Sequence, residues 1–410
     1  MIRFFVIIII TVSVKTVFAQ NFNRGRIKQR NYFELISYQQ IKGLPVVPVT
    51  IHGKTYNFLF DTGAMFAISD KLYRETNPPI IGYTGISGSS GEIRNMKIIR
   101  FPELFLQGIT FINTRGVVLH EKSEFFDCLE IDGIIGSNML RNSTVQIDNQ
   151  SKHIIITNKL SSGKHEYQKM IFIDRQSRPY IYITMQKGEK KINQRVLFDS
   201  GMTNFFDLNF LTAIRNGDVV DIIAESEGIL ALGIHGIHPK QKHLLLHIPE
   251  VVINNLTFKD VIITTANNSN SRIGAKLLEY GKVTLDFNKK RFYFNPFDNI
   301  NTETVSENLY TFGITIQNDK PVVGIIWDKT LESEINFGDE VLSIDGIDIQ
   351  AWNLCQLLSF EFQPANDDHY VELRNINTGE IKKVVLKRLQ LNVNMQHRIY
   401  HFKKGQKWIL

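Results

Sequence analysis

The sequence predicts a mainly β protein with two similar sheet-forming lobes and a third, smaller β domain. Short runs of alternating apolar and polar residues, ended by glycine or asparagine, are typical of half-buried strands. Between about residues 30 and 297 an ordered set of short motifs occurs twice, which indicates an internal duplication. Beyond Phe297 a polar stretch typical of a linker separates these lobes from further strand patterns.

Length and composition are those of a globular protein. The 410 residues leave room for two or three domains, and 43% hydrophobic with 21% charged residues is an ordinary balance. The net charge of +6 comes from scattered Lys and Arg without interleaved aromatic residues, so we expect no nucleic-acid partner. The expected segments are a signal peptide at 1–19, a first lobe at 20–165, a second lobe at 166–297, a linker at 298–308, the third domain at 309–392 and a tail at 393–410.

The first nineteen residues predict export. Arg3 precedes an apolar run at 4–14 that is too short to span a bilayer. Val17 and Ala19 suit a cleavage site before Gln20, and the alternative is an uncleaved amino-terminal anchor. We expect a mature chain without an integral membrane segment, located in the periplasm, at the cell surface or in the medium.

The repeated motifs place one carboxylate at the same point of each lobe. Asp61-Thr62-Gly63 and Asp199-Ser200-Gly201 each follow an apolar triplet, and each is preceded by a predicted hairpin. Ile134-Ile135-Gly136 and Arg272-Ile273-Gly274 follow at the same separation from their Asp residues. Short helices are expected at 207–215 and after Gly136 and Gly274.

Two such turns on symmetric halves can bring two carboxylates together. Like charges at that distance cannot both ionise, so the pair shares a proton. One carboxylate can then act as a base toward water while its protonated partner polarises a carbonyl group. The glycines Gly63 and Gly201 permit tight turns, and the hydroxyls of Thr62 and Ser200 are expected to bond across the interface. The alternative is that each Asp only caps its own turn.

With these motifs the chain resembles aspartic proteases of the pepsin and retropepsin type. The resemblance implies an aspartic endopeptidase, a peptide hydrolase, with Asp61 and Asp199 as catalytic residues and no metal or cofactor. One chain carries both halves, so a monomer is expected. Met202 stands where the family has a small residue, and it either narrows the site or packs beneath the turn. Flaps covering the site are expected to include Gly85, Ile86, Gly88, Gly233 and Gly236.

Cysteines and histidines give weaker signals. Cys128 and Cys355 lie far apart in sequence, and we expect them in different domains as buried free thiols. Four histidines crowd residues 235–247, but their spacing matches no zinc signature, so no metal site is expected.

The third domain resembles a PDZ domain of the bacterial protease-associated kind. The resemblance rests on residues 338–346, with a helix expected at 352–360 and a closing hairpin at 370–374 and 382–388. It implies that the backbone near Phe312, Gly313 and Ile314 receives a peptide carboxy-terminus by strand addition. The domain either recruits such a peptide or braces the lobes.

The sequence therefore favours an exported aspartic endopeptidase acting on peptides or proteins. The alternative is a catalytically inactive peptide-binding protein that keeps the protease fold and works through its PDZ domain.

Overall fold

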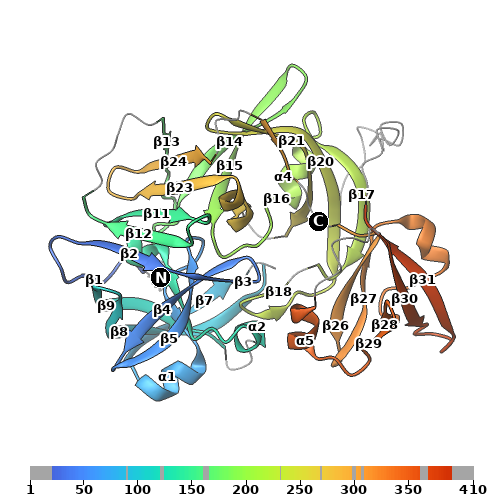
Figure 1. Cartoon of the computed structure of the whole chain (residues 1–410), viewed down its shortest axis with the longest axis horizontal. Coiled ribbons are helices and arrows are strands. Elements are labelled where there is room, and N and C mark those ends of the chain that lie inside the picture. Colours follow the sequence, from blue (N-terminus) through green and yellow to red (C-terminus); the bar gives the residue numbers. More distant parts are fainter. Residues whose placement is uncertain are drawn as a thin grey trace, which may run out of the picture.

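The computed structural model describes residues 21–88, 91–120, 124–159, 166–230, 232–267, 270–297, 302–305, 309–360 and 368–389. The predicted signal peptide and tail, and much of the predicted linker, lie outside the described residues. Strands dominate the described chain, as predicted (Figure 1). Within these ranges, no helix is both long and apolar enough to cross a membrane.

The first sheet carries Asp61 at the end of a central strand. Its hairpin, β4 (Leu44–Ile51) and β5 (Lys54–Asp61), confirms the prediction and turns at His52 and Gly53, both with positive φ. The sheet order is β1-β9-β6-β10-β5-β4-β8-β7, with β3 paired to β4. The other strands are β1 (Arg26–Ile27), β3 (Gln39–Ile41), β6 (Ala67–Ile68), β7 (Ile80–Ser87), β8 (Ile93–Leu106), β9 (Ile109–Val118) and β10 (Gly133–Gly136).

The second sheet repeats these pairings around Asp199, in the order β17-β20-β14-β15-β22-β16-β21-β25. Strand β5 runs parallel to β10, as β15 does to β22, and β6 and β16 hold equivalent places beside them. The common pattern fits the duplication, which stays a prediction from the sequence. The strands are β14 (Tyr180–Lys187), β15 (Lys190–Asp199), β16 (Phe206–Asn209), β17 (Asp221–Gly228), β20 (Gln241–Ile253), β21 (Leu256–Ala266), β22 (Ser271–Gly274) and β25 (Thr302–Thr304).

Helices are short. The expected turns after Gly136 and Gly274 are present as α3 (Ser137–Leu140) and η1 (Ala275–Glu279), beside α1 (Asp70–Thr76) and α2 (Glu124–Cys128). The predicted helix at 207–215 is wrong over its first residues, because 207–209 pair in β16 with β21, and Asp207 also pairs with β22. Helix α4 (Phe210–Arg215) starts only after Asn209, whose side chain accepts from the Thr212 N–H as an N-cap.

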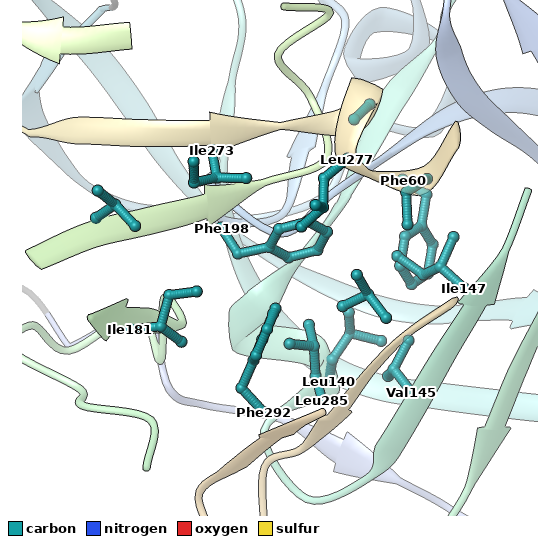
Figure 2. Packing of buried hydrophobic residues seen from close by; sticks show 14 of the residues in the cluster. Phe60, Leu140, Val145, Ile147, Ile181, Phe198, Ile273, Leu277, Leu285 and Phe292 are labelled. Carbon is teal, nitrogen blue, oxygen red and sulfur yellow. The ribbon is translucent and has the colours of Figure 1, made fainter. Parts of the chain in front are cut away.

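A third sheet takes strands from both of the predicted lobes. Strand β11 of the first lobe pairs antiparallel with β23 of the second, so each lobe supplies half of a continuous six-stranded sheet. Figure 2 shows Phe60, Phe198 and Leu277 packed in one core with side chains of this sheet. The strands, in sheet order, are β13 (Gln168–Lys169), β24 (Arg291–Pro296), β23 (Gly281–Asp286), β11 (Thr144–Asp148), β12 (His153–Thr157) and β2 (Phe33–Ser37).

The region after the linker forms a separate sheet, in the order β26-β27-β28-β30-β31 with β29 paired to β28. The expected helix and closing hairpin are present as α5 (Leu354–Ser359) and the β30–β31 pair, although the PDZ assignment stays a prediction. The elements are β26 (Phe312–Gln317), β27 (Lys320–Ile326), η2 (Lys329–Ser333), β28 (Glu340–Ile344), β29 (Ile347–Asp348), β30 (Asp368–Arg374) and β31 (Ile381–Lys387).

This third unit is attached to both lobes (Figure 1). Its Ile325 and Trp327 pack on Leu245 of β20, and Gly324 accepts a backbone bond of 2.7 Å from Ile229. On the other side α5 packs against α2, and a disulfide joins Cys128 to Cys355. The expectation of free thiols is therefore wrong. The fold brings the two Cα atoms to 4.8 Å although 227 residues separate them in sequence.

Candidate active site

Asp61 and Asp199 occupy equivalent places at the ends of strands β5 and β15. Each lies in register with a glycine of the parallel neighbour, Gly136 for Asp61 and Gly274 for Asp199. The carboxyl residues are 9% and 7% exposed. Their preceding residues, Phe60 and Phe198, are fully buried in the shared core, which fixes where each strand ends (Figure 2).

Reciprocal hydrogen bonds lock the two turns to each other. The Thr62 hydroxyl donates to the Phe198 carbonyl (2.7 Å) and accepts from the Ser200 N–H (3.1 Å). In the same way, the Ser200 hydroxyl donates to the Phe60 carbonyl (2.7 Å) and accepts from the Thr62 N–H (3.0 Å). All four residues are buried, and an unmade hydrogen bond is costly in such a place. The predicted bonding of Thr62 and Ser200 across the interface is present.

The glycines of the turns allow the carboxyl groups to approach. A Cβ on Gly63 would lie 2.4 Å from Cγ of Asp199, and one on Gly201 would lie 2.4 Å from Cγ of Asp61. Each glycine N–H also donates to the carboxylate of its own turn, over 2.7 Å to Asp61 and 3.1 Å to Asp199. Each carboxyl group therefore lies against the glycine of the opposite turn, beside the other carboxyl group.

This environment disfavours a second negative charge. Burial raises the pKa of Asp61 well above its usual range, and the charge of Asp199 raises it further, while the Gly63 N–H opposes the shift. Asp61 therefore holds a proton at pH values where an exposed aspartate is ionised. A carboxylic acid and a carboxylate in contact can supply a proton donor and a proton acceptor to the same reacting group.

An ion pair stands beside Asp199. The Arg272 guanidinium contacts Asp199 (Nη1 to Oδ2, 3.4 Å) and binds Asp207 through both Nε (2.9 Å) and Nη2. Burial raises the pKa of Asp207 against the opposing effect of Arg272. Burial lowers the pKa of Arg272, but the charges of Asp207 and Asp199 outweigh it and keep the guanidinium protonated. The sequence marked Arg272 only as a departure from an apolar pattern.

Met202 packs beneath its turn, the second of the two predicted alternatives. Its side chain is buried, and its terminal methyl lies 2.9 Å from the position of a Cβ on Gly274. The Met202 carbonyl accepts from the Ala275 N–H over 2.7 Å. Met202 thus joins the second catalytic-loop candidate to the strand that supports it.

The flap candidates of the two lobes meet. Gly85 and Ile86 lie on β7 with Gly88 just beyond it, and Gly233 and Gly236 lie on the hairpin of β18 (Leu232–Gly233) and β19 (Gly236–Ile237). The His235 ring joins the hairpins through Nε2, 3.0 Å from the Ile86 carbonyl. Ile86 and Ile234 also pack against one buried apolar cluster, and so does Ala64, which directly follows the first turn.

The other sequence candidates lie elsewhere or form no metal site. Phe312, Gly313 and Ile314 lie on β26 of the third unit, in a different sheet from the two Asp residues, and Phe312 is buried in that unit's core. Among the residues that the structure describes, no group of three or more His, Cys, Asp or Glu side chains is arranged to hold a metal ion.

One family of known proteins matches the part of the chain that contains the first turn. Residues 47–139 match the aspartyl protease family model. The match contains Asp61 and residues 134–136, and it supports an aspartyl protease domain in this part of the chain. It ends before Asp199. No curated protein matches the chain.

Sequence reasoning missed three features near the site: the Asp207–Arg272 pair, the His235 link between hairpins and the Cys128–Cys355 disulfide. For the Asp207–Arg272 pair, the only signal in the sequence was an arginine at a position that is otherwise apolar. His235 lay between the glycines chosen as flap candidates, which was a signal for the second. Nothing in the spacing of the cysteines indicated the third.

Proposed function

We propose that the protein is an aspartic endopeptidase in which Asp61 and Asp199 together activate water. The observation that carries this proposal is the pair of reciprocally bonded turns, which holds two buried carboxyl groups side by side. The family match of residues 47–139 supports the same activity.

The reaction needs one proton on the pair. The ionised carboxylate takes a proton from water as its oxygen bonds to the peptide carbonyl carbon, and the protonated partner gives its proton to the carbonyl oxygen. As the C–N bond of the tetrahedral intermediate breaks, the carboxyl group that took the proton from water gives it to the leaving amine. One hydroxyl of the intermediate returns its proton to the other carboxylate as the new carboxyl product forms, which restores the single shared proton. The buried turns keep the two groups in position without reorganisation during the reaction.

Cleavage of a peptide library over a range of pH tests the proposal. The mature chain, residues 20–410, is compared with Asp61→Asn and with Asp218→Asn, an exposed aspartate at the surface. We expect cleavage by the parent and by Asp218→Asn and none by Asp61→Asn. A folded parent that cleaves nothing at any pH would instead favour the non-catalytic peptide-binding protein.

We also propose that the third unit braces the lobes and that the protein is exported. The disulfide to α2 and the packing on β20 support bracing, and a disulfide persists best in an oxidising compartment. Recruitment of a peptide carboxy-terminus at β26 stays the alternative to bracing. Fractionation of expressing cells tests export, and the mass of the recovered protein shows whether cleavage occurs before Gln20.

A further inference from the structure

The two lobes differ at one pair of positions beside the carboxyl groups. In the first lobe β10 and β6 place Ile134 opposite Ala67, and both are buried in an apolar cluster. In the second lobe β22 and β16 place Arg272 opposite Asp207 at the corresponding register. An apolar pair on one side of the site thus corresponds to an ion pair on the other.

Asp207 holds the Arg272 guanidinium so that it faces Asp199. One Asp207 carboxylate oxygen accepts from Nε and Nη2 of the arginine, and the other accepts from its backbone N–H (3.0 Å). The remaining nitrogen, Nη1, lies 3.4 Å from Oδ2 of Asp199. The arginine side chain is only 17% exposed, so solvent screens this contact weakly. The described part of the chain places no cation in an ion pair with Asp61.

Other titratable groups face this arrangement. Asp61 and Asp207 are the acidic groups beside Asp199, and its charge raises the pKa of both. Tyr180 on β14 is neutral, because burial raises the pKa of its phenol. Burial, and then the charge of Arg272, lower the pKa of His238 to about 4, so its imidazole is neutral at higher pH. Among the described residues, Arg272 is the cation that forms an ion pair with a member of the carboxyl pair.

We propose that Arg272 is a positioning residue that keeps Asp199 as the ionised member of the pair, which leaves the shared proton on Asp61. This inference rests on the proposed function. A nearby cation favours the charged form of a carboxyl group, and here it contacts only one of the two. Asp199 is then the group that accepts the proton from water, and Asp61 is the group that protonates the peptide carbonyl.

The test replaces the ion pair by the apolar residues found at the corresponding positions of the first lobe. The double variant Asp207→Ala/Arg272→Ile copies Ala67 and Ile134, and it removes Asp207 and Arg272 together so that neither is left as a buried charge without the other. With the cation gone, both limbs of the pH profile of kcat/KM should move to higher pH, by about one pH unit. The single variant Asp207→Asn keeps the arginine but removes its counter-charge, and its limbs should move to lower pH. Arg272→Lys, which keeps a cation, should stay nearest to the parent.

Opposite shifts in the first two variants are the result that a purely structural role would not give. The inference is overturned if the parent cleaves peptides and the variants show unchanged limbs, or limbs that move in the same direction. If the double variant does not fold, the direction of the Asp207→Asn shift decides. Absence of cleavage by the folded parent would refute the proposed function itself, and the inference with it.

Discussion

Thr62 and Ser200 carry the closest link between the two halves of the site. Each hydroxyl makes two buried hydrogen bonds to the other half, so the geometry of the carboxyl pair depends on two small side chains. The hydroxyl group is what the two positions share, because threonine makes these bonds in one turn and serine makes them in the other.

Replacing Thr62 by valine should destabilise the protein. The substitution keeps the shape but leaves the Ser200 N–H and the Phe198 carbonyl unpaired, which should lower the free energy of unfolding by about 2–4 kcal/mol. Thr62→Ser keeps both bonds and is the matched control. Urea denaturation measures the difference, and equal losses in the two variants would show that the hydrogen bonds are not the cause.

Replacing Asp61 by asparagine should stabilise the protein as it removes activity. Because the pKa of Asp61 is raised in the native state, that state binds more protons than the unfolded chain above about pH 4, and stability falls as pH rises. Asparagine can still accept from Gly63 and carries no charge. We expect a gain on the order of 1 kcal/mol at pH 7 and a smaller one at pH 4 in urea denaturation. A variant less stable than the parent at both pH values would contradict this account.

The two hairpins that carry the flap candidates are linked by the side chain of His235. His235 bonds the Ile86 carbonyl through Nε2, while its buried Nδ1 has no hydrogen-bond partner in the described chain. Burial, first among the causes, lowers the pKa of His235. Protonation would place a donor at Nδ1 that nothing satisfies, which costs free energy in a buried position.

The contact between the hairpins should therefore weaken in acid. The native state resists the proton that an exposed histidine takes up below about pH 6.5, so stability of the contact is lost as pH falls below that value. Hydrogen exchange of residues 80–88 and 232–237, corrected for the intrinsic rate, should show less protection at pH 5 than at pH 7.5. His235→Gln offers a donor that does not titrate, and the same pH dependence in that variant would exclude His235 as the cause.

At the scale of the whole molecule, the third unit connects the second predicted lobe to the first. Packing at Leu245 attaches it to one lobe and the disulfide attaches it to the other. A crosslink across a long stretch of chain restricts the unfolded state and limits how far the attached parts separate.

Removing the disulfide should loosen the third unit. Cys128→Ser/Cys355→Ser is expected to lose about 2–5 kcal/mol of stability relative to the oxidised parent. Limited proteolysis should cut this variant near the linker sooner than it cuts the parent. Reductant should have the same effect on the parent and none on the variant, and a parent that is indifferent to reductant would contradict a bracing role for the bond.

Local patterns predicted much of the fold and of the candidate site. The hairpins ending at Asp61 and Asp199, and the turns after Gly136 and Gly274, follow from strand alternation and from motifs a few residues long. The helix boundary at Asn209 was missed because pairing with β21 overrides local preference. The β11–β23 pairing and the disulfide were missed as well, since they join residues that only the complete fold brings together.

The most direct test of the central claim is a double-mutant cycle on peptide cleavage. Asp61→Asn, Asp199→Asn and the double variant are compared with the parent in kcat/KM at the optimal pH. If the carboxyl groups share a proton and act as one unit, each single variant should lose at least about 10³-fold and the double variant should lose little more. A single variant that keeps the parent rate, or losses that multiply in the double variant, would contradict the claim that Asp61 and Asp199 form one catalytic pair.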